Sequence, residues 1–161
     1  MKLEPGFIIR EATNEDSAAI TNLVFNVLRE YDLLPNLEKT DADLFRVFDS
    51  YQKKGGIFYI IERQGIILGC AGILYLSSSK CELRKMYLHP SIRGKGIGKF
   101  LLEQMIFKAK ELGFSKMTLE TASVLKEAIS LYIRYGFVKI NREHMSCRCD
   151  QAYELKLNTI P

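Results

Sequence analysis

A glycine-rich turn with interleaved cations is the segment of this sequence whose residue types most clearly predict chemistry. It reads Arg93-Gly94-Lys95-Gly96-Ile97-Gly98-Lys99, with three glycines within five residues. Glycines let the backbone approach phosphate oxygens, and the first N–H groups of a following helix add hydrogen bonds and partial positive charge. A plain helix start with surface lysines is the alternative, but so many glycines would cost conformational entropy without a ligand. The turn therefore predicts a phosphate site.

Two well-known phosphate-binding loops do not fit this turn. A P-loop has four residues between its first glycine and its Gly-Lys pair, and Ser or Thr follows the pair. Here three residues separate Gly94 from Gly98, and Phe100 follows Lys99. A dinucleotide fingerprint, Gly-x-Gly-x-x-Gly, would need its last glycine at Lys99 or Leu101. The spacing excludes both loops.

The spacing that does match is the acyl-CoA motif Gln/Arg-x-x-Gly-x-Gly/Ala, which Arg93, Gly96 and Gly98 fill. On this motif the chain resembles the GNAT superfamily of acyl-CoA-dependent N-acetyltransferases. The similarity extends to three further segments, residues 82–90, 119–121 and 128–137. It covers most of the chain, and residues 81–137 carry its specific part.

This resemblance implies acetyl-CoA as the acyl-donor cosubstrate and no metal. It implies that the backbone N–H groups of Met86 and Leu88 meet the acetyl carbonyl and the pantetheine arm, in a slot between splayed strands. The pyrophosphate would lie on the turn, with Arg93, Gly94, Lys95, Gly96, Ile97, Gly98 and Lys99 as its binding residues. Leu125 departs from the family pattern, which often has an asparagine there, and this puts cofactor contacts from the last helix in doubt.

Tyr132 is the candidate proton donor. By resemblance it stands, four residues before Gly136, where many members place a tyrosine that protonates the leaving thiolate. A phenol with a pKa of about 10 suits that role if it lies within hydrogen-bond reach of the sulfur. Ala128, Leu131, Tyr132 and Tyr135 also follow the spacing of a buried helix face. A purely structural tyrosine is therefore the alternative.

Glu82 is the first candidate for the base. It precedes Arg93 by eleven residues, the interval that separates the catalytic glutamate from the motif in histone-acetylating members. Alternation along a strand would place it on one face with Arg84, Met86 and Leu88. Burial could raise its pKa toward neutrality. The alternatives are a structural ion pair with Arg84 or a water chain that carries the proton, and Glu120 on the neighbouring strand is the second choice.

Three weaker signals have ordinary structural interpretations. A zinc site would need more than one Cys-x-Cys, so we expect the possible ligands to line the loop before the last strand. These residues are His144, Cys147, Cys149 and Asp150. His89 is either a phosphate contact or a turn residue before Pro90. The aromatic residues Phe45, Phe48 and Tyr51 follow helical spacing, which favours core or a pocket wall over a nucleic-acid platform.

Charge is unevenly distributed along the chain. The total of 23 Lys+Arg against 19 Asp+Glu gives +4, too little to argue for nucleic-acid binding. Residues 84–116 have 8 basic and 2 acidic side chains (+6), whereas residues 1–56 have 7 and 10 (−3). The positive segment contains the predicted phosphate turn. Since residues 13–56 usually form one wall of the acceptor pocket in the family, the acidic excess gives the hypothesis of a cationic acceptor.

The periodicity of apolar residues predicts an α/β fold with a mixed sheet, in one domain covering residues 1–161. The predicted strands are 7–9, 57–62, 66–76, 81–89, 116–121, 137–140 and 152–157, and the predicted helices are 13–31, 40–56, 96–112 and 126–135. We expect Leu112 to lie on the apolar, inward-facing side of the long third helix. The resemblance implies a mostly antiparallel, twisted sheet of about six to seven strands with about four helices and splayed central strands.

The sequence thus favours an acetyl-CoA-dependent N-acetyltransferase that acts on the primary amine of a small molecule or peptide. A non-catalytic acyl-CoA-binding or sensing domain of the same fold is the alternative, and a nucleic-acid-binding module is a weaker one. The first residues lack the apolar core of a secretion signal, and the apolar stretches are too short for a membrane span. Four cysteines are few for a disulfide scaffold of this length, so we expect reduced thiols. Together these features favour a cytoplasmic protein without membrane or nucleic-acid partners. Homodimers are common in the family.

Overall fold

Seven strands form one mixed sheet at the centre of the structure, a computed structural model that describes residues 3–157. Residues 1–2 and 158–161, the two ends of the predicted domain, lie outside the described residues. The sheet order is β1-β2-β3-β4-β5-β7-β6. The strands are β1 (Phe7–Glu11), β2 (Ile57–Arg63), β3 (Ile66–Tyr75), β4 (Lys80–Leu88), β5 (Lys116–Thr121), β6 (Val138–Ile140) and β7 (Gln151–Lys156). Only β4 and β5 pair in parallel. The predicted fold class is confirmed.

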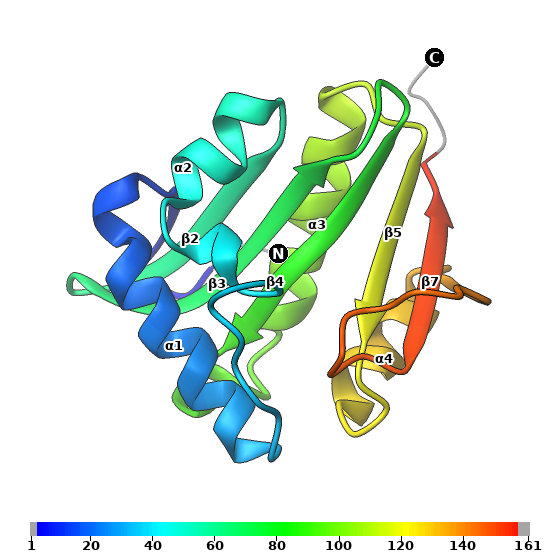
Figure 1. The fold of residues 1–161 in the computed structure, drawn as a ribbon. Coiled ribbons are helices and arrows are strands. Elements are labelled where there is room, and N and C mark those ends of the chain that lie inside the picture. Colours follow the sequence, from blue (N-terminus) through cyan, green and yellow to red (C-terminus); the bar gives the residue numbers. More distant parts are fainter. Residues whose placement is uncertain (1–2, 158–161) are drawn as a thin grey trace.

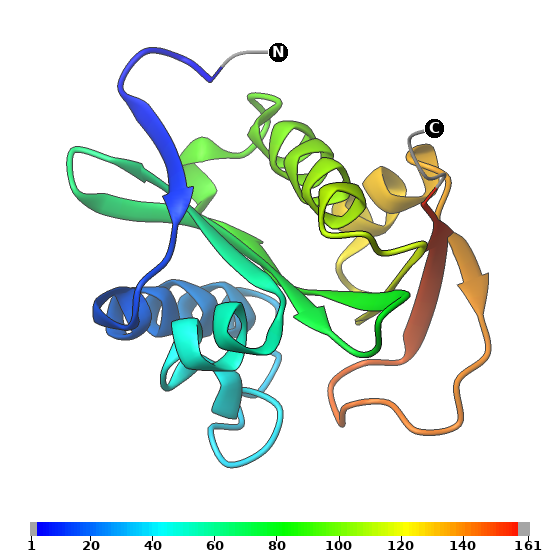
Figure 2. The same cartoon turned by 90° about the horizontal axis from the view of Figure 1, so that it is seen from above.

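Helices cover both faces of the sheet. They are α1 (Ser17–Glu30), α2 (Val47–Ser50), α3 (Ile97–Glu111) and α4 (Lys126–Arg134). Figure 1 shows the sheet with α1 and α2 in front, and Figure 2 shows these two helices on one face with α3 and α4 on the other. Within the described part of the chain, no helix combines the length and hydropathy of a membrane span.

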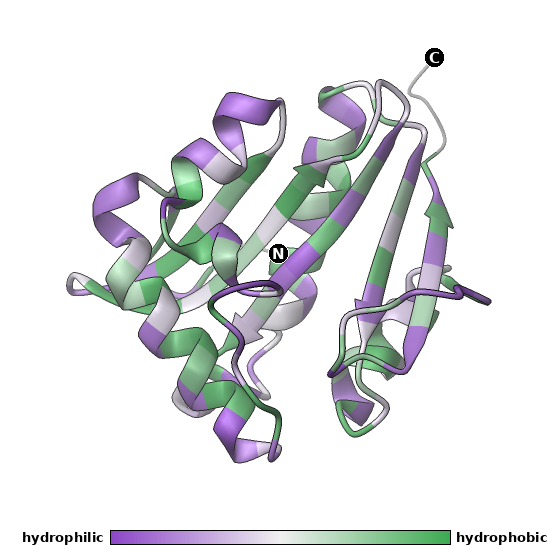
Figure 3. Ribbon diagram, in the orientation of Figure 1, coloured by the Kyte–Doolittle hydropathy of each residue, from purple (hydrophilic) through white to green (hydrophobic). Residues whose placement is uncertain are grey.

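Each face of the sheet has its own hydrophobic core. On the α1 side, apolar residues of that helix pack with Tyr51 and with Phe58 and Ile60 of β2. On the α3 side, Leu101, Leu102 and Met105 pack on the opposite face. The hydrophobic colour of Figure 3 runs along the central strands, and hydrophilic residues interrupt β4 near its middle. That interruption is important for the site.

The segment between α1 and β2 differs from its prediction. A single helix over 40–56 is wrong, because the chain forms three short pieces, residues 42–44, 47–50 and 52–54. Leu44, Val47 and Tyr51 are buried as the stripe predicts, but Phe45 is 74% exposed and Phe48 37%. Helical spacing was therefore a poor guide to the aromatic residues, since a broken helix rotates its faces at each break. Leu112, predicted to point inward, is also exposed at the end of α3.

The sheet is splayed where β4 meets β5. Their parallel register covers only three pairs, from Lys80↔Lys116 to Glu82↔Thr118. Beyond this point the two strands diverge, as Figure 1 shows toward the lower end of β5. The other partner of each strand stays paired, so the divergence leaves a backbone edge of each strand facing the gap. The predicted splay of the central strands is confirmed.

Candidate functional site

One pocket of about 340 Å³ lies at the splay between β4 and β5. Its size falls in the range of small-molecule and cofactor sites. At one end, which we call the turn end, it is lined by Arg93, Gly94, Gly96, Gly98 and Lys99. At the other, the carboxylate end, Glu82 and Glu120 reach it from the two diverging strands. Residues predicted from sequence at separate positions therefore line the same pocket.

The turn end is built mainly from backbone. Gly94 and Gly96 have φ of 73° and 77°, the left-handed region that glycine adopts at least cost. The first hydrogen bond of α3 runs from the Phe100 N–H to the Gly96 carbonyl, so the N–H groups of Ile97, Gly98 and Lys99 have no acceptor within the helix. These donors and the helix dipole favour an anion at this end of the pocket.

The side chains of the turn do not all face the pocket. Ile97 is buried in the α3-side core, and the pocket lining includes neither it nor Lys95. The Arg93 guanidinium donates to both oxygens of Glu30, at 2.8 and 3.0 Å, and to the Leu88 carbonyl at 3.0 Å. Arg93 thus ties the turn to the end of α1 and to β4. In this structure the guanidinium pairs with the Glu30 carboxylate and not with a phosphate. The phosphate role of Arg93 stays a prediction.

Tyr132 lies on α4 and lines the pocket. Its side chain is buried, with the ring 5.6 Å from that of Phe137, and burial raises the pKa of the phenol well above its ordinary value. The hydroxyl therefore stays protonated at neutral pH and is available as a proton donor. Among the described residues, no acceptor takes a hydrogen bond from it. Ala128 and Leu131 of the same helix, and Leu125 just before it, add apolar lining.

Glu82 and Glu120 are linked through a shared arginine. Arg142, from the segment between β6 and β7, lies 3.6 Å from a Glu82 oxygen and 3.7 Å from a Glu120 oxygen. The other Glu82 oxygen lies 3.3 Å from Nε of Arg84. Burial raises the pKa of Glu82, the charge of Arg84 opposes that shift, and the Glu120 carboxylate adds to it. Glu82 therefore has both features considered from the sequence: it forms an ion pair with Arg84, and its pKa is raised.

A bulge in β4 corrects the predicted strand faces. Two residues of β4, Lys85 and Met86, lie opposite one residue of β3, because Gly72 pairs with Arg84 but Cys70 pairs with Tyr87. The extra residue reverses the alternation beyond it. Met86 and Leu88 consequently pack with the α3-side core together with Cys81 and Leu83, whereas Tyr87 packs on the α1 side. The prediction that Glu82, Arg84, Met86 and Leu88 share one face is wrong.

Lys85, in this bulge, was not predicted as part of the site. Its backbone has φ 55°, an uncommon conformation for a lysine, and only 3% of its side chain is exposed. The ammonium donates to the Thr40 carbonyl at 2.9 Å and contacts Asp43 at 3.1 Å and Asp41 at 3.2 Å. Asp41 is fully buried and also accepts two hydrogen bonds from Arg148, at 2.7 and 2.8 Å.

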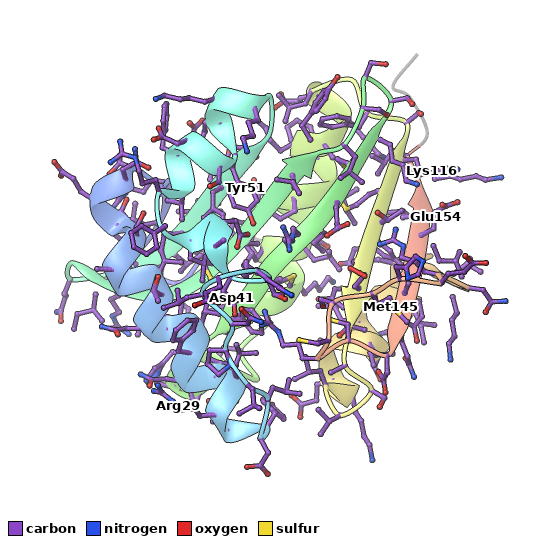
Figure 4. All side chains as sticks on the ribbon, viewed as in Figure 1. Arg29, Asp41, Tyr51, Lys116, Met145 and Glu154 are labelled. Atoms are coloured by element: carbon purple, nitrogen blue, oxygen red, sulfur yellow. The ribbon has the colours of Figure 1, made fainter. Side chains whose placement is uncertain are left out.

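We call Asp41, Asp43, Lys85 and Arg148 the buried ion cluster. Two carboxylates and two cations make it neutral, and its side chains are at most 9% exposed. Burial works against the charge on Asp41, but hydrogen bonds from Arg148 and Asn36 and the charge of Lys85 prevail and lower its pKa. Figure 4 shows Asp41 in front of β4 and Met145, on the segment that contains Arg148, across the gap.

Two of the weaker candidates, His89 and Asp150, make local hydrogen bonds. The His89 ring accepts a hydrogen bond from the Ser91 N–H, so it caps the turn and does not line the pocket. Asp150 accepts hydrogen bonds from the backbone and hydroxyl of Ser123. Within residues 3–157, no three His, Cys, Asp or Glu side chains gather as a metal site. Cys149 lines the pocket, but burial raises the pKa of its thiol.

The splayed sheet, with a glycine turn before a helix at one end of the gap and two half-buried carboxylates at the other, is the arrangement expected of an acyl-CoA-dependent transferase. The family described as acetyltransferase (GNAT) matches residues 23–137 of the chain. The protein belongs to this family.

Two relatives that cover most of the chain are also named acetyltransferases. YjgM of Escherichia coli K12, an N-acetyltransferase described as uncharacterized, is 36% identical over 158 residues, which cover 92% of this chain and 95% of YjgM. An IAA acetyltransferase of Azospirillum brasilense is 33% identical over 132 residues, covering 81% and 82% of the two chains.

Solved structures share the fold. A GNAT-family acetyltransferase from Staphylococcus aureus Mu50 superposes with a TM-score of 0.88 at 22% identity, covering 94% of this chain and 99% of its own. The structure of yncA from Salmonella typhimurium with its cofactor acetyl-CoA has a TM-score of 0.72 at 25% identity, with 95% of each chain covered. Neighbours of this fold therefore include an acetyl-CoA complex.

Proposed function

We propose that this protein transfers the acetyl group of acetyl-CoA to a primary amine, by direct attack within a ternary complex. The observation that carries the proposal is that one pocket is lined by the glycine turn, Tyr132 and the two carboxylates Glu82 and Glu120. These are the groups that acetyl transfer needs: an anion site for the CoA phosphates, a proton donor and a proton acceptor.

The residues of the pocket fit a CoA thioester. The pyrophosphate would bind at the turn end, on the N–H groups of Ile97, Gly98 and Lys99. The backbone edge of β4 beyond Glu82, including Met86 and Leu88, would hold the pantetheine arm and the acetyl carbonyl. When bound, acetyl-CoA supplies an activated acyl group and a thiol leaving group.

The chain's own groups would move the two protons. Glu82 would accept a proton from the incoming ammonium, so that the neutral amine forms the new C–N bond while the C–S bond breaks. Its raised pKa makes it a better base than an exposed glutamate, and Glu120 stands next to it as the second candidate. Tyr132 would give its phenolic proton to the leaving thiolate and would regain one from the nitrogen, directly or through water, as the amide forms. The proton taken by Glu82 would pass to solvent. Burial raises the pKa of the Tyr132 phenol, so it is protonated at neutral pH and is a weaker acid than an exposed tyrosine.

Direct transfer is favoured over an acyl-enzyme. Thiolates, not thiols, are the nucleophiles in cysteine chemistry. Burial raises the pKa of Cys70 and of Cys81 to about 12, and it also raises the pKa of Cys149, the cysteine that lines the pocket. The conditions for a reactive thiolate at the pocket are therefore unfavourable.

The acceptor is to be found by experiment. Thiol release from acetyl-CoA is measured with a panel of amines: small amines, amino acids, aminated drugs and peptides with a free N-terminus. We expect at least one amine to give turnover, and Tyr132→Phe to lower kcat by about 100-fold while CoA binding persists. Tyr135→Phe is the matched control, because this tyrosine of the same helix segment binds Glu103 and does not line the pocket.

The outcomes separate the candidate functions. CoA binding without turnover for any amine would favour the acyl-CoA-binding domain instead of an enzyme. Unchanged kcat in Tyr132→Phe, with turnover in the parent protein, would remove Tyr132 from the mechanism and leave the transferase assignment in place.

A further inference from the structure

The buried ion cluster joins three segments that are far apart in the sequence. Asp41 belongs to the segment between α1 and α2, Lys85 to the bulge of β4, and Arg148 to the segment between β6 and β7. Arg148 and Asp41 are 107 positions apart, and Lys85 and Thr40 are 45 apart. All three segments contribute residues to the carboxylate end of the pocket, among them Thr40, Lys85 and Cys149.

The cluster is placed behind the pocket wall. Asp41 does not line the pocket, yet it touches Lys85 and Arg148, which do. It also closes its own segment, because its carboxylate accepts the Asn36 N–H at 2.8 Å and its N–H donates to the Asn36 carbonyl at 2.7 Å. Asp41 therefore holds one wall of the pocket and fastens it to the two others.

The contacts of Asp41 differ from those of the carboxylates that face the pocket. Its two hydrogen bonds with Arg148 are short and bidentate, at 2.7 and 2.8 Å, whereas the ion pairs of Glu82 lie between 3.3 and 3.6 Å. Bidentate charge-assisted hydrogen bonds fix geometry strongly. Buried charges that lose one partner are left uncompensated, so the cluster acts as a unit.

Lys85 links this unit to the backbone that lines the gap. Its left-handed conformation forms the bulge, and unusual backbone conformations persist where surrounding contacts over-determine them. Three such contacts reach its ammonium, from Thr40, Asp41 and Asp43. The buried ion cluster thus contacts both the segment around Asp41 and the β4 bulge. Next to Lys85 in this bulge, Met86 packs with the α3-side core.

We propose that Asp41 is a positioning residue for the acceptor: through Lys85 and Arg148 it sets the shape of the carboxylate end of the pocket, while the turn end forms without it. This rests on the proposed function for the meaning of that end. The cluster should determine the KM for the amine. It should also keep the two segments that contain Asp41 and Arg148 in a fixed conformation. It should affect CoA binding much less than the amine KM, because no cluster residue contributes to the turn 93–99 that would hold the CoA phosphates, although the bulge adjoins the strand edge proposed for the pantetheine arm.

The test compares Asp41→Asn, Arg148→Met and Arg148→Lys with the parent protein. The acceptor is the amine of the panel that the parent protein acetylates fastest, and CoA binding is measured by calorimetry. We expect Asp41→Asn and Arg148→Met to raise the amine KM at least about tenfold, since small displacements of a positioned substrate are costly. Arg148→Lys keeps the charge and should restore part of the loss. Asp49→Asn is the control. This substitution also removes ion pairs, those of Asp49 with Arg46 and Lys53, but Asp49 does not line the pocket.

Hydrogen exchange gives a second readout that needs no turnover. We expect Asp41→Asn to speed amide exchange in residues 34–46 and 141–150. In residues 93–99 the exchange rates of the variant should equal those of the parent protein, both without CoA and with it. If Asp41→Asn does not fold, Arg148→Lys and Arg148→Met decide by the same measurements. Unchanged amine KM with unchanged exchange would overturn the proposal, and so would equal losses of CoA binding and amine KM. If the parent protein acetylates no amine, the proposed function fails while the exchange data still test the cluster.

Discussion

The two ends of the pocket are built in opposite ways. The turn end consists of seven consecutive residues, and most of what it offers a ligand is backbone. The carboxylate end is assembled from side chains on β4, β5 and two long connecting segments, and ion pairs hold it together. An end made from consecutive residues depends mainly on local conformation, with Arg93 as its tie to α1 and β4, whereas the other end depends on contacts across the whole fold. Single substitutions should therefore affect the two ends separately.

The largest expected effect comes from Gly96→Glu at the turn end. The side chain would strain a left-handed backbone and bring negative charge to the anion site. We expect the Kd for CoA to rise more than about 100-fold, a loss of about 2.7 kcal/mol, in calorimetric titration. Gly113→Glu is the matched control, since Gly113 also has positive φ and ends the same helix away from the pocket. Full CoA binding by Gly96→Glu would refute the cofactor assignment of the turn.

An intermediate effect is expected from the charges around Glu82 at the carboxylate end. A base must be deprotonated, so activity falls at low pH, and the raised pKa of Glu82 moves this acid limb to higher pH than an ordinary glutamate would give. Removing the cation in Arg84→Met should move the limb of kcat/KM to higher pH by about 0.5 to 1 unit. Removing the like charge in Glu120→Gln should move it to lower pH.

The opposite signs of these shifts identify the base. If Glu120 were the base, Glu120→Gln would abolish the acid limb or the activity instead of shifting the limb. Lys116→Met serves as the control, because Lys116 pairs with Glu154 at 3.4 Å outside the pocket and should leave the profile in place.

The smallest effect should come from Glu30→Gln, where the turn end touches α1. Both partners of the Arg93–Glu30 pair are partly exposed, so the loss should lower the free energy of unfolding by only about 0.2 to 1 kcal/mol in urea titration. CoA binding should change little if the turn is formed by its own backbone. Glu111→Gln, which removes a comparable pair with Lys108, gives the background. A large loss of CoA binding would show that the turn depends on α1 and would weaken the contrast between the two ends.

The contrast also explains what could be predicted from the sequence. Lys116–Thr121 was predicted as a strand at its observed bounds, and Gln64-Gly65 forms the turn between β2 and β3 with positive φ at both residues. Such features are encoded by neighbouring residues. The glycine turn belongs to the same kind, and its place at the pocket could be predicted for that reason.

The acceptor side could not be predicted in the same way. Nothing in the local sequence of Lys85 indicates a bulge, and no spacing relates Asp41 to Arg148. The acidic excess of residues 1–56 led to the hypothesis of a cationic acceptor, but Asp41 and Asp43 are paired with Lys85 and Arg148. A charge count along the chain does not include partners that only tertiary structure brings together.

The short pairing of β4 with β5 has a consequence for how the sheet meets its surroundings. An ordinary open sheet has two edge strands, here β1 and β6, but the splay adds two inner edges within the sheet. Edge strands usually invite pairing with another chain, which proteins must prevent. Here residues of α4 and of the connecting segments line the space beside the inner edges. The protein keeps open hydrogen-bonding backbone in its interior while hiding it from other chains.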